Sequence, residues 1–152
     1  MEARYQLGEC YFTIGKYEAA IDHYTKFIES YPEESRARMA AYKIGCAYQK
    51  LVKWLEAHTQ YQGLIRQNMK DEIARNALSK IKLLVSSHPT ITITRDDRMS
   101  YGLVLYYAGQ YKAAREELKK VIQGADNLSA KAAYFIAESY YRENDYLAAL
   151  RE

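Results

Sequence analysis

The sequence contains few residues whose types and spacing suit catalysis or metal binding. Its histidines, His23, His58 and His88, are far apart, and none has a second His, Cys or carboxylate at a metal-ligand spacing. Asp22 adjoins His23, but consecutive residues of a helix point in different directions. There is no phosphate-binding loop, nucleophile elbow or paired-carboxylate motif. We therefore expect surface histidines and a protein that is not an enzyme and uses no metal or cofactor.

The two cysteines, Cys10 and Cys46, suit a packing role rather than reactivity. We interpret them as small apolar residues of the core, a role in which free cysteine packs well. A disulfide bridge between them is the alternative, provided that the helices that carry them are neighbours.

Helices must position all of these residues, and their pattern is clearest in YQLGECYFTIGKYEAAIDHYTKFIESYP, residues 5–32. Apolar and small residues recur there at intervals of three or four, which places them on one stripe of a helix. Gly15 interrupts the stripe and predicts a tight turn between two helices. Pro32 predicts that the second helix ends near Ser30 or Tyr31.

The same pattern returns along the chain. The second copy repeats it at Ile44, Gly45, Tyr48, Trp54, Ala57, Tyr61 and Ile65, which follow their counterparts by 37 residues. The third has Gly102, Leu105, Gly109, Tyr111, Ala114, Leu118 and Ile122, and the fourth has Ile136, Ala137, Tyr140, Tyr146 and Ala149. Since one hairpin cannot bury both apolar faces, repetition indicates stacked hairpins.

These residues resemble the tetratricopeptide repeat, a unit of about 34 residues with two helices, small residues where the helices cross and a closing proline. The resemblance implies an all-α fold: a right-handed α-solenoid of antiparallel helix hairpins. A repeat length of 37, with Tyr-Pro-x-x-Ser before the next unit, also resembles a bacterial envelope branch. That branch includes lipoproteins of outer-membrane assembly and the periplasmic coordinator of the Tol-Pal system.

Residues 67–98 interrupt the repeat. DEIARNALSKIKLLVSS predicts one amphipathic helix, with Asn68 placed to cap its start. After Pro89, alternating Thr and Ile residues favour an extended chain. Thr94 and Asp97 then form a capping-box pattern that restarts the helix.

We interpret residues 67–98 as a degenerate unit in the middle of the solenoid, with one helix and an extended connection. Residues 1–66 form two repeat units, and residues 99–152 form a third and a truncated fourth, all in one continuous solenoid. The connection packs against neighbouring repeats, or alternatively forms a bend or a docking strand for a partner. Because solenoids close with polar terminal units, we expect the chain to be a piece of a longer protein.

Tyrosine is unusually frequent, with 16 against 3 Phe and 1 Trp. Repeat positions predict core roles for Tyr11, Tyr24, Tyr48, Tyr61 and Tyr140. The tetratricopeptide resemblance implies that one face of each first helix lines a concave groove: Tyr5, Glu9 and Phe12; Met39, Tyr42, Cys46 and Gln49; Met99, Leu103 and Tyr106; Tyr134, Glu138 and Tyr141. This mostly apolar and aromatic row suits a peptide with apolar or aromatic residues. The alternative is that neighbouring helices bury the row.

The function predicted first is a non-enzymatic scaffold that binds a peptide or helix of a protein partner within a larger assembly. One alternative is nucleic-acid binding, because residues 35–98 contain 12 basic and 5 acidic side chains. Another is self-association through exposed repeat ends. We expect no small-molecule substrate. No run of apolar residues approaches the roughly 20 residues that a membrane span requires, so we expect no membrane-spanning helix. The bacterial resemblance implies a periplasmic location, and without it we expect a cytoplasmic one.

Overall fold

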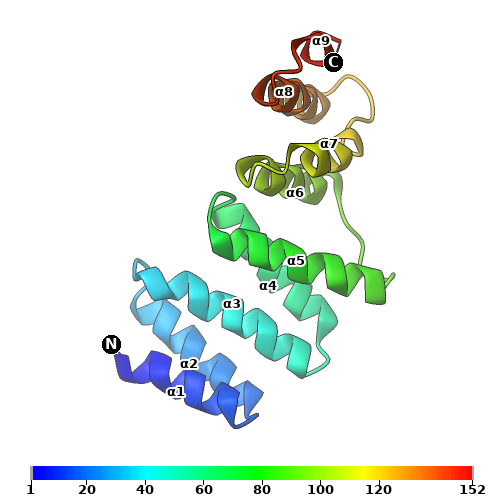
Figure 1. Ribbon diagram of the computed structural model, residues 1–152. Coiled ribbons are helices and arrows are strands. Elements are labelled where there is room, and N and C mark those ends of the chain that lie inside the picture. The colour runs from blue at the N-terminus through cyan, green and yellow to red at the C-terminus, as the bar shows by residue number, and fades with distance from the viewer. Residues whose placement is uncertain (1, 152) are drawn as a thin grey trace. The chain divides into compact units, whose positions relative to one another are not determined.

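Helices make up the regular structure of the protein (Figure 1). Its computed structural model describes residues 2–151, and no β-strand lies in that range. The helices are α1 (Glu2–Thr13), α2 (Tyr17–Ser30), α3 (Ser35–Lys50), α4 (Trp54–Gln67), α5 (Glu72–Ser87), α6 (Arg95–Tyr107), α7 (Tyr111–Lys119), α8 (Asn127–Arg142) and α9 (Tyr146–Ala149). The predicted all-α solenoid of helical hairpins is confirmed. None of the helices described has the length and apolar character that crossing a bilayer requires.

The hairpin turns use a left-handed residue at equivalent positions of the repeat. Gly15 and Gly109 have φ angles of 78° and 73°, and Val52 and Asn144 take 61° and 63° at the corresponding places. A residue in this conformation ends one helix and lets the chain reverse. The predicted turn at Gly15 is confirmed, and α2 ends at Ser30 as expected.

Small residues lie where the two helices of a hairpin cross. A Cβ atom added to Gly8 would lie 2.6 Å from the ring of Tyr24, and one added to Gly45 would lie 2.5 Å from the ring of Tyr61. Gly102 of α6 repeats the contact at 2.6 Å with a leucine of α7. Each glycine therefore lets a bulky side chain of the second helix pack directly on the backbone of the first.

The first of two compact units comprises the chain up to Leu64 together with Ser79–Ile91. In this unit α2 packs against both α1 and α3. The core cluster between these helices contains Ala20, Tyr24, Phe27, Ala40 and Ile44, with Tyr11 and Tyr48 packed against it. Tyr61 of α4 is also fully buried.

The second unit comprises Ile65–Leu78 and the residues from Thr92 onward. Here α7 packs against α6 and α8, and α8 packs against α9. The core cluster contains Met99, Leu103, Leu118, Val121, Ala132 and Ile136, with Tyr140 packed against it. The division into repeat units at residues 66 and 98 stays a prediction.

Local capping defines where α5 and α6 begin. Thr94 accepts a hydrogen bond from the Asp97 backbone N–H at 3.2 Å, and Thr94 N–H donates to Asp97 Oδ2 at 3.1 Å. The predicted capping box is thus confirmed. The prediction that Asn68 caps α5 was wrong, because Asp71 Oδ1 accepts the Ala74 N–H at 2.8 Å, directly before the helix. Asn68 instead accepts a hydrogen bond from the Lys70 backbone N–H in the preceding loop.

The structure corrects two predictions about burial. Cys10 and Cys46 are both free, and Cys10 is exposed rather than part of the core. Cys10 lies two residues after Gly8, on the opposite side of α1 from the helix crossing. His58 is buried, with 4% of its surface exposed, because it lies four residues after Trp54 and three before Tyr61 on the inward stripe of α4. The other two histidines are half-buried, and His23 stacks on the ring of Tyr11.

Candidate partner-binding site

In the first unit, the α1 residues predicted for the groove are held by neighbouring helices. Glu9 accepts hydrogen bonds from the Tyr24 hydroxyl of α2 and from Lys43 Nζ of α3, the latter at 3.0 Å. The same ammonium group lies 5.3 Å from the centre of the Phe12 ring. Tyr5 packs its ring against Tyr24 at 5.8 Å. The negative charge of Glu9 is therefore already balanced by Lys43 within the protein.

The α3 residues of the predicted groove surround the hydroxyl of Tyr61. This hydroxyl donates to Gln49 Oε1 at 2.7 Å and lies 3.3 Å from Cys46 Sγ. The ring of Tyr42 lies 5.6 Å from that of Tyr61, and Met39 is half-buried on the same helix. Burial raises the pKa of Tyr42 to about 12, and the proximity of Cys46 adds to the shift. These tyrosines are neutral hydrogen-bonding groups at neutral pH.

In the second unit the predicted residues are divided between the core and the surface. Met99 and Leu103 of α6 belong to the core cluster but still reach a surface pocket. Tyr106 is half-buried and donates a hydrogen bond to Glu138 Oε1 of α8 at 3.3 Å. Tyr134 and Tyr141 of α8 expose 62% and 58% of their surface. These two tyrosines are the predicted groove residues most accessible to a partner.

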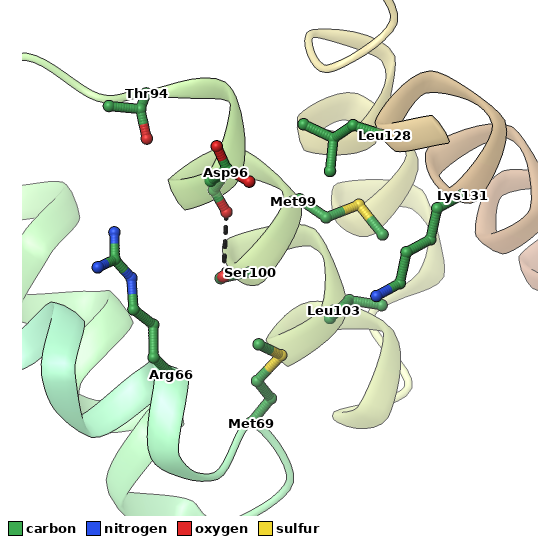
Figure 2. Close-up of a pocket in the computed structure, with 9 residues that line it drawn as sticks. All are labelled: Arg66, Met69, Thr94, Asp96, Met99, Ser100, Leu103, Leu128 and Lys131. Carbon is green, nitrogen blue, oxygen red and sulfur yellow. Dashed lines mark hydrogen bonds between the residues drawn. The ribbon is translucent and has the colours of Figure 1, made fainter. Parts of the chain in front are cut away.

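An open pocket of about 590 Å³, which Met99 and Leu103 help to line, lies in the second unit (Figure 2). Its wall includes the apolar side chains of Met69, Met99, Leu103 and Leu128. The polar residues around it are Arg66, Thr94, Asp96, Ser100 and Lys131. The residues that line the pocket come from the end of α4 and the loop after it, from the start of α6, and from α8. The volume lies within the range of pockets that bind specific ligands or partner side chains.

The two basic residues of the pocket differ in their partners. Arg66 donates a hydrogen bond to Asp97 Oδ1 at 2.7 Å, so its charge is largely matched. Burial of Asp97 raises the pKa of this carboxyl, but hydrogen bonds from Thr94 and Arg66 outweigh burial and hold the pKa below its usual value. Lys131 forms no hydrogen bond or ion pair among the described residues, and Figure 2 shows its side chain reaching toward Leu103.

Sequence reasoning named Met99 and Leu103 of this pocket and missed its other lining residues: Arg66, Met69, Thr94, Asp96, Ser100, Leu128 and Lys131. Leu128 and Lys131 lie on α8 at helical spacing before Tyr134, so extending that stripe toward the start of the helix would have found them. Arg66 and Met69 lie at the end of α4 and in the loop after it, where no periodic pattern indicates the direction of a side chain.

A second open pocket of about 510 Å³ lies in the first unit, away from the predicted groove residues. Val52, Leu55 and Ile91 contribute apolar side chains to it. His88 and Trp54 also line this pocket, with their ring centres 4.5 Å apart. Val52 and Leu55 are both highly exposed.

Among residues 2–151, no three side chains of His, Cys, Asp or Glu gather where they could hold a metal ion. The chemistry that the pockets offer is that of apolar, aromatic and charged contacts.

Comparison with known proteins assigns this helical chain to a family. The family model described as intraflagellar transport protein 56 matches residues 4–151. The chain belongs to the intraflagellar transport protein 56 family. No curated protein matches it.

Membership of the intraflagellar transport protein 56 family corrects the narrower resemblance drawn from the repeat length. Intraflagellar transport is a process of eukaryotic cilia, so the bacterial envelope resemblance and the periplasmic location that it implied were wrong. A 37-residue spacing and a Tyr-Pro-x-x-Ser junction reflect hairpin geometry, which unrelated helical repeats share.

Proposed function

We propose that this member of the intraflagellar transport protein 56 family is a non-enzymatic scaffold that binds another protein of the transport machinery. The partner contributes a peptide or helix, and the contact lies on the face formed by α6 and α8. The site works in the cytoplasm or the cilium, where the process that names the family takes place.

One observation carries the proposal: α8 presents two exposed tyrosines and, through Leu128 and Lys131, also lines an open pocket with an apolar floor in the second unit. Tyr134 and Tyr141 lie seven residues apart on α8 and therefore share one face of the helix. The ring of Tyr134 lies 5.2 Å from that of Phe135, which in turn contacts Tyr106 at 5.2 Å. Exposed tyrosines that pack against a neighbouring ring are typical anchors of a protein interface.

The groove residues of the first unit support a smaller role in binding. Glu9, Tyr24 and Lys43 satisfy one another, as do Tyr61 and Gln49. Polar groups that already have partners gain little from a ligand. We therefore place the main contact in the second unit.

The nucleic-acid alternative gains no support from the arrangement of charges. Several basic residues of residues 35–98 are paired within the protein: Lys43 with Glu9, Arg66 with Asp97, Arg95 with Asp126 and Arg98 with Glu117. These pairs leave less free positive charge for phosphates than the composition indicated.

Self-association through exposed repeat ends stays a prediction. Light scattering over a dilution series tests it.

The proposed contact is tested by replacing both exposed tyrosines with alanine. We expect Tyr134→Ala with Tyr141→Ala to weaken binding to the purified transport complex by about tenfold or more, since interface tyrosines contribute roughly 1–3 kcal/mol each. Leu83→Ala is the matched control, because Leu83 is exposed to 64% but lies on α5 in the first unit. Equal affinity of the double variant and the control, with unchanged circular dichroism, would contradict the proposed site.

A further inference from the structure

The pocket of the second unit has a fixed apolar floor and an adaptable rim. Met99 and Leu103 expose only 4% and 5% of their surface and are packed into the core cluster, so the floor is held by the fold. Met69 and Leu128 are half-buried and pack against the same cluster from the rim. A thioether side chain such as that of Met69 adapts to the shape of a partner. The apolar floor thus suits a bulky apolar side chain, and the pocket of about 590 Å³ leaves room for neighbouring groups beside it.

The charged groups around this floor lie apart. Arg66 is matched by Asp97 at 2.7 Å, and Figure 2 shows Asp96 on the Ser100 side of Met99, away from Lys131. Lys131 has no partner among the described residues, although it stands at the edge of an apolar surface. An ammonium group in this position favours a carboxylate from outside the chain.

The surface that continues from the pocket has the spacing of a helix face. Lys131, Tyr134, Glu138 and Tyr141 follow one another on α8 at intervals of three or four. Arg142 Nε donates to Glu138 Oε1 at 3.0 Å, which leaves Lys131 as the cation of this row without a partner. Residues 2–151 contain no strand whose edge could pair with an extended peptide. A partner helix laid along α8 would meet the row with side chains one turn apart.

We propose that the pocket binds one apolar side chain of an amphipathic partner helix, and that this helix carries an acidic side chain about one turn away that pairs with Lys131. The inference rests on the proposed function and specifies its partner: an acidic amphipathic helix that uses Leu, Met or Phe as its anchor.

The test uses a phage-displayed library of helix-forming peptides of about 18 residues, roughly five turns long. The library is selected on the 152-residue protein, and each selected peptide is then measured on three variants. Lys131→Glu reverses the charge at the pocket, and Met69→Ala removes part of its rim. Lys82→Glu makes the same charge change at an exposed position of α5 and is the control.

We expect the selected peptides to share an apolar residue and an acidic residue three or four positions apart. Lys131→Glu should weaken their binding by at least about tenfold, since like charges in contact repel. Changing the acidic residue of the peptide to Lys should restore binding to the Lys131→Glu variant. Met69→Ala should weaken binding, and Lys82→Glu should leave it unchanged.

Three results would overturn the inference. The first is that selected peptides bind more weakly to the Met69→Ala variant but equally well to the Lys131→Glu variant. This result would contradict the acidic residue of the partner and would leave the apolar anchor of the proposed function intact. The second is selection of extended, proline-containing peptides, which removes the helix. The third is failure to select any peptide; binding of the purified transport complex to the tyrosine double variant then decides separately whether the proposed function also fails.

Discussion

At the scale of single residues, three glycines set how closely paired helices approach. Gly8, Gly45 and Gly102 each face a bulky side chain from the next helix, and an added Cβ would overlap that side chain at 2.5–2.6 Å. Real Cβ contacts are not this short, so a larger residue forces the helices apart. The fold depends on these positions more than on the exposed surface.

Gly45→Ala tests this close approach. We expect it to lower the free energy of unfolding by about 1–3 kcal/mol, because the ring of Tyr61 is fully buried and has no free space to move into. Urea denaturation followed by circular dichroism measures the change. Gly63→Ala is the control: nothing lies within 4 Å of its added Cβ, so better helix propensity should raise stability by about 0.5–1 kcal/mol. Equal effects of the two substitutions would contradict the packing argument.

The buried tyrosines make stability depend on alkaline pH. Burial raises the pKa of Tyr24 and Tyr61 above the ordinary value, with added effects of Glu9 and Cys46, and raises that of Tyr42 to about 12. A raised pKa in the folded protein favours the neutral form, so this stabilisation is complete below the unfolded pKa of about 10 and is lost as pH rises through the folded values.

We therefore expect the free energy of unfolding to fall between about pH 10 and pH 12. Denaturant melts at several pH values, with tyrosinate absorbance as a second signal, measure this loss. Tyr61→Phe should reduce the slope, because it removes one of the raised groups. A slope that Tyr61→Phe leaves unchanged would show that this hydroxyl does not contribute to the pH dependence.

At the scale of elements, the hairpin turns show where one residue departs from the repeat. Gly15, Gly109 and Asn144 suit a left-handed backbone, but Val52 adopts a φ of 61° at the equivalent position. A β-branched side chain is strained in that conformation, at a cost of roughly 1–2 kcal/mol. Val52 exposes 64% of its surface, so packing does little to offset the strain.

Replacing Val52 with Asn should therefore stabilise the protein. We expect Val52→Asn to raise the free energy of unfolding by about 0.5–1 kcal/mol, because Asn tolerates the left-handed region better than a β-branched residue does. Thermal unfolding gives the sign directly. Gly109→Val should lower stability at the equivalent turn between α6 and α7. Destabilisation by Val52→Asn would mean that contacts of the valine side chain outweigh its strain.

Sequence patterns predicted elements well where the signal is local. The capping box of Thr94 and Asp97 depends on two residues three positions apart, and the turn at Gly15 depends on one. The cap of α5 was misplaced because Asn68 and Asp71 are both good capping residues, and only the actual start of the helix distinguishes them. Burial of His58 could have been predicted from its place between Trp54 and Tyr61 on the inward stripe of α4.

The candidate site was harder to predict because it is assembled from distant segments. Met99 and Leu103 were named from repeat register, and they do line the pocket. Arg66, at the end of α4, and Met69, in the loop after it, line the same pocket from about 30 positions earlier in the chain. Position in a repeat cannot predict such a contact, because the loop follows no repeat.

At the scale of the whole molecule, the two compact units differ in what they offer a partner. The first unit satisfies its groove residues internally through Glu9, Lys43, Tyr61 and Gln49. The second unit presents exposed tyrosines, an open pocket and the ammonium group of Lys131. Because helical repeats contact mainly their neighbours, one unit can specialise in binding without loss of the common hairpin architecture.

We propose that the face formed by α6 and α8 contacts another protein of the transport machinery. Site-specific photocrosslinking in ciliated cells measures this directly, with benzoylphenylalanine replacing Tyr134 at the proposed contact and replacing Leu83 on α5 as the control. We predict a crosslink from position 134 to another intraflagellar transport protein, reduced by Lys131→Glu, and none to that protein from position 83. A crosslink from position 83 and none from position 134 would contradict the account.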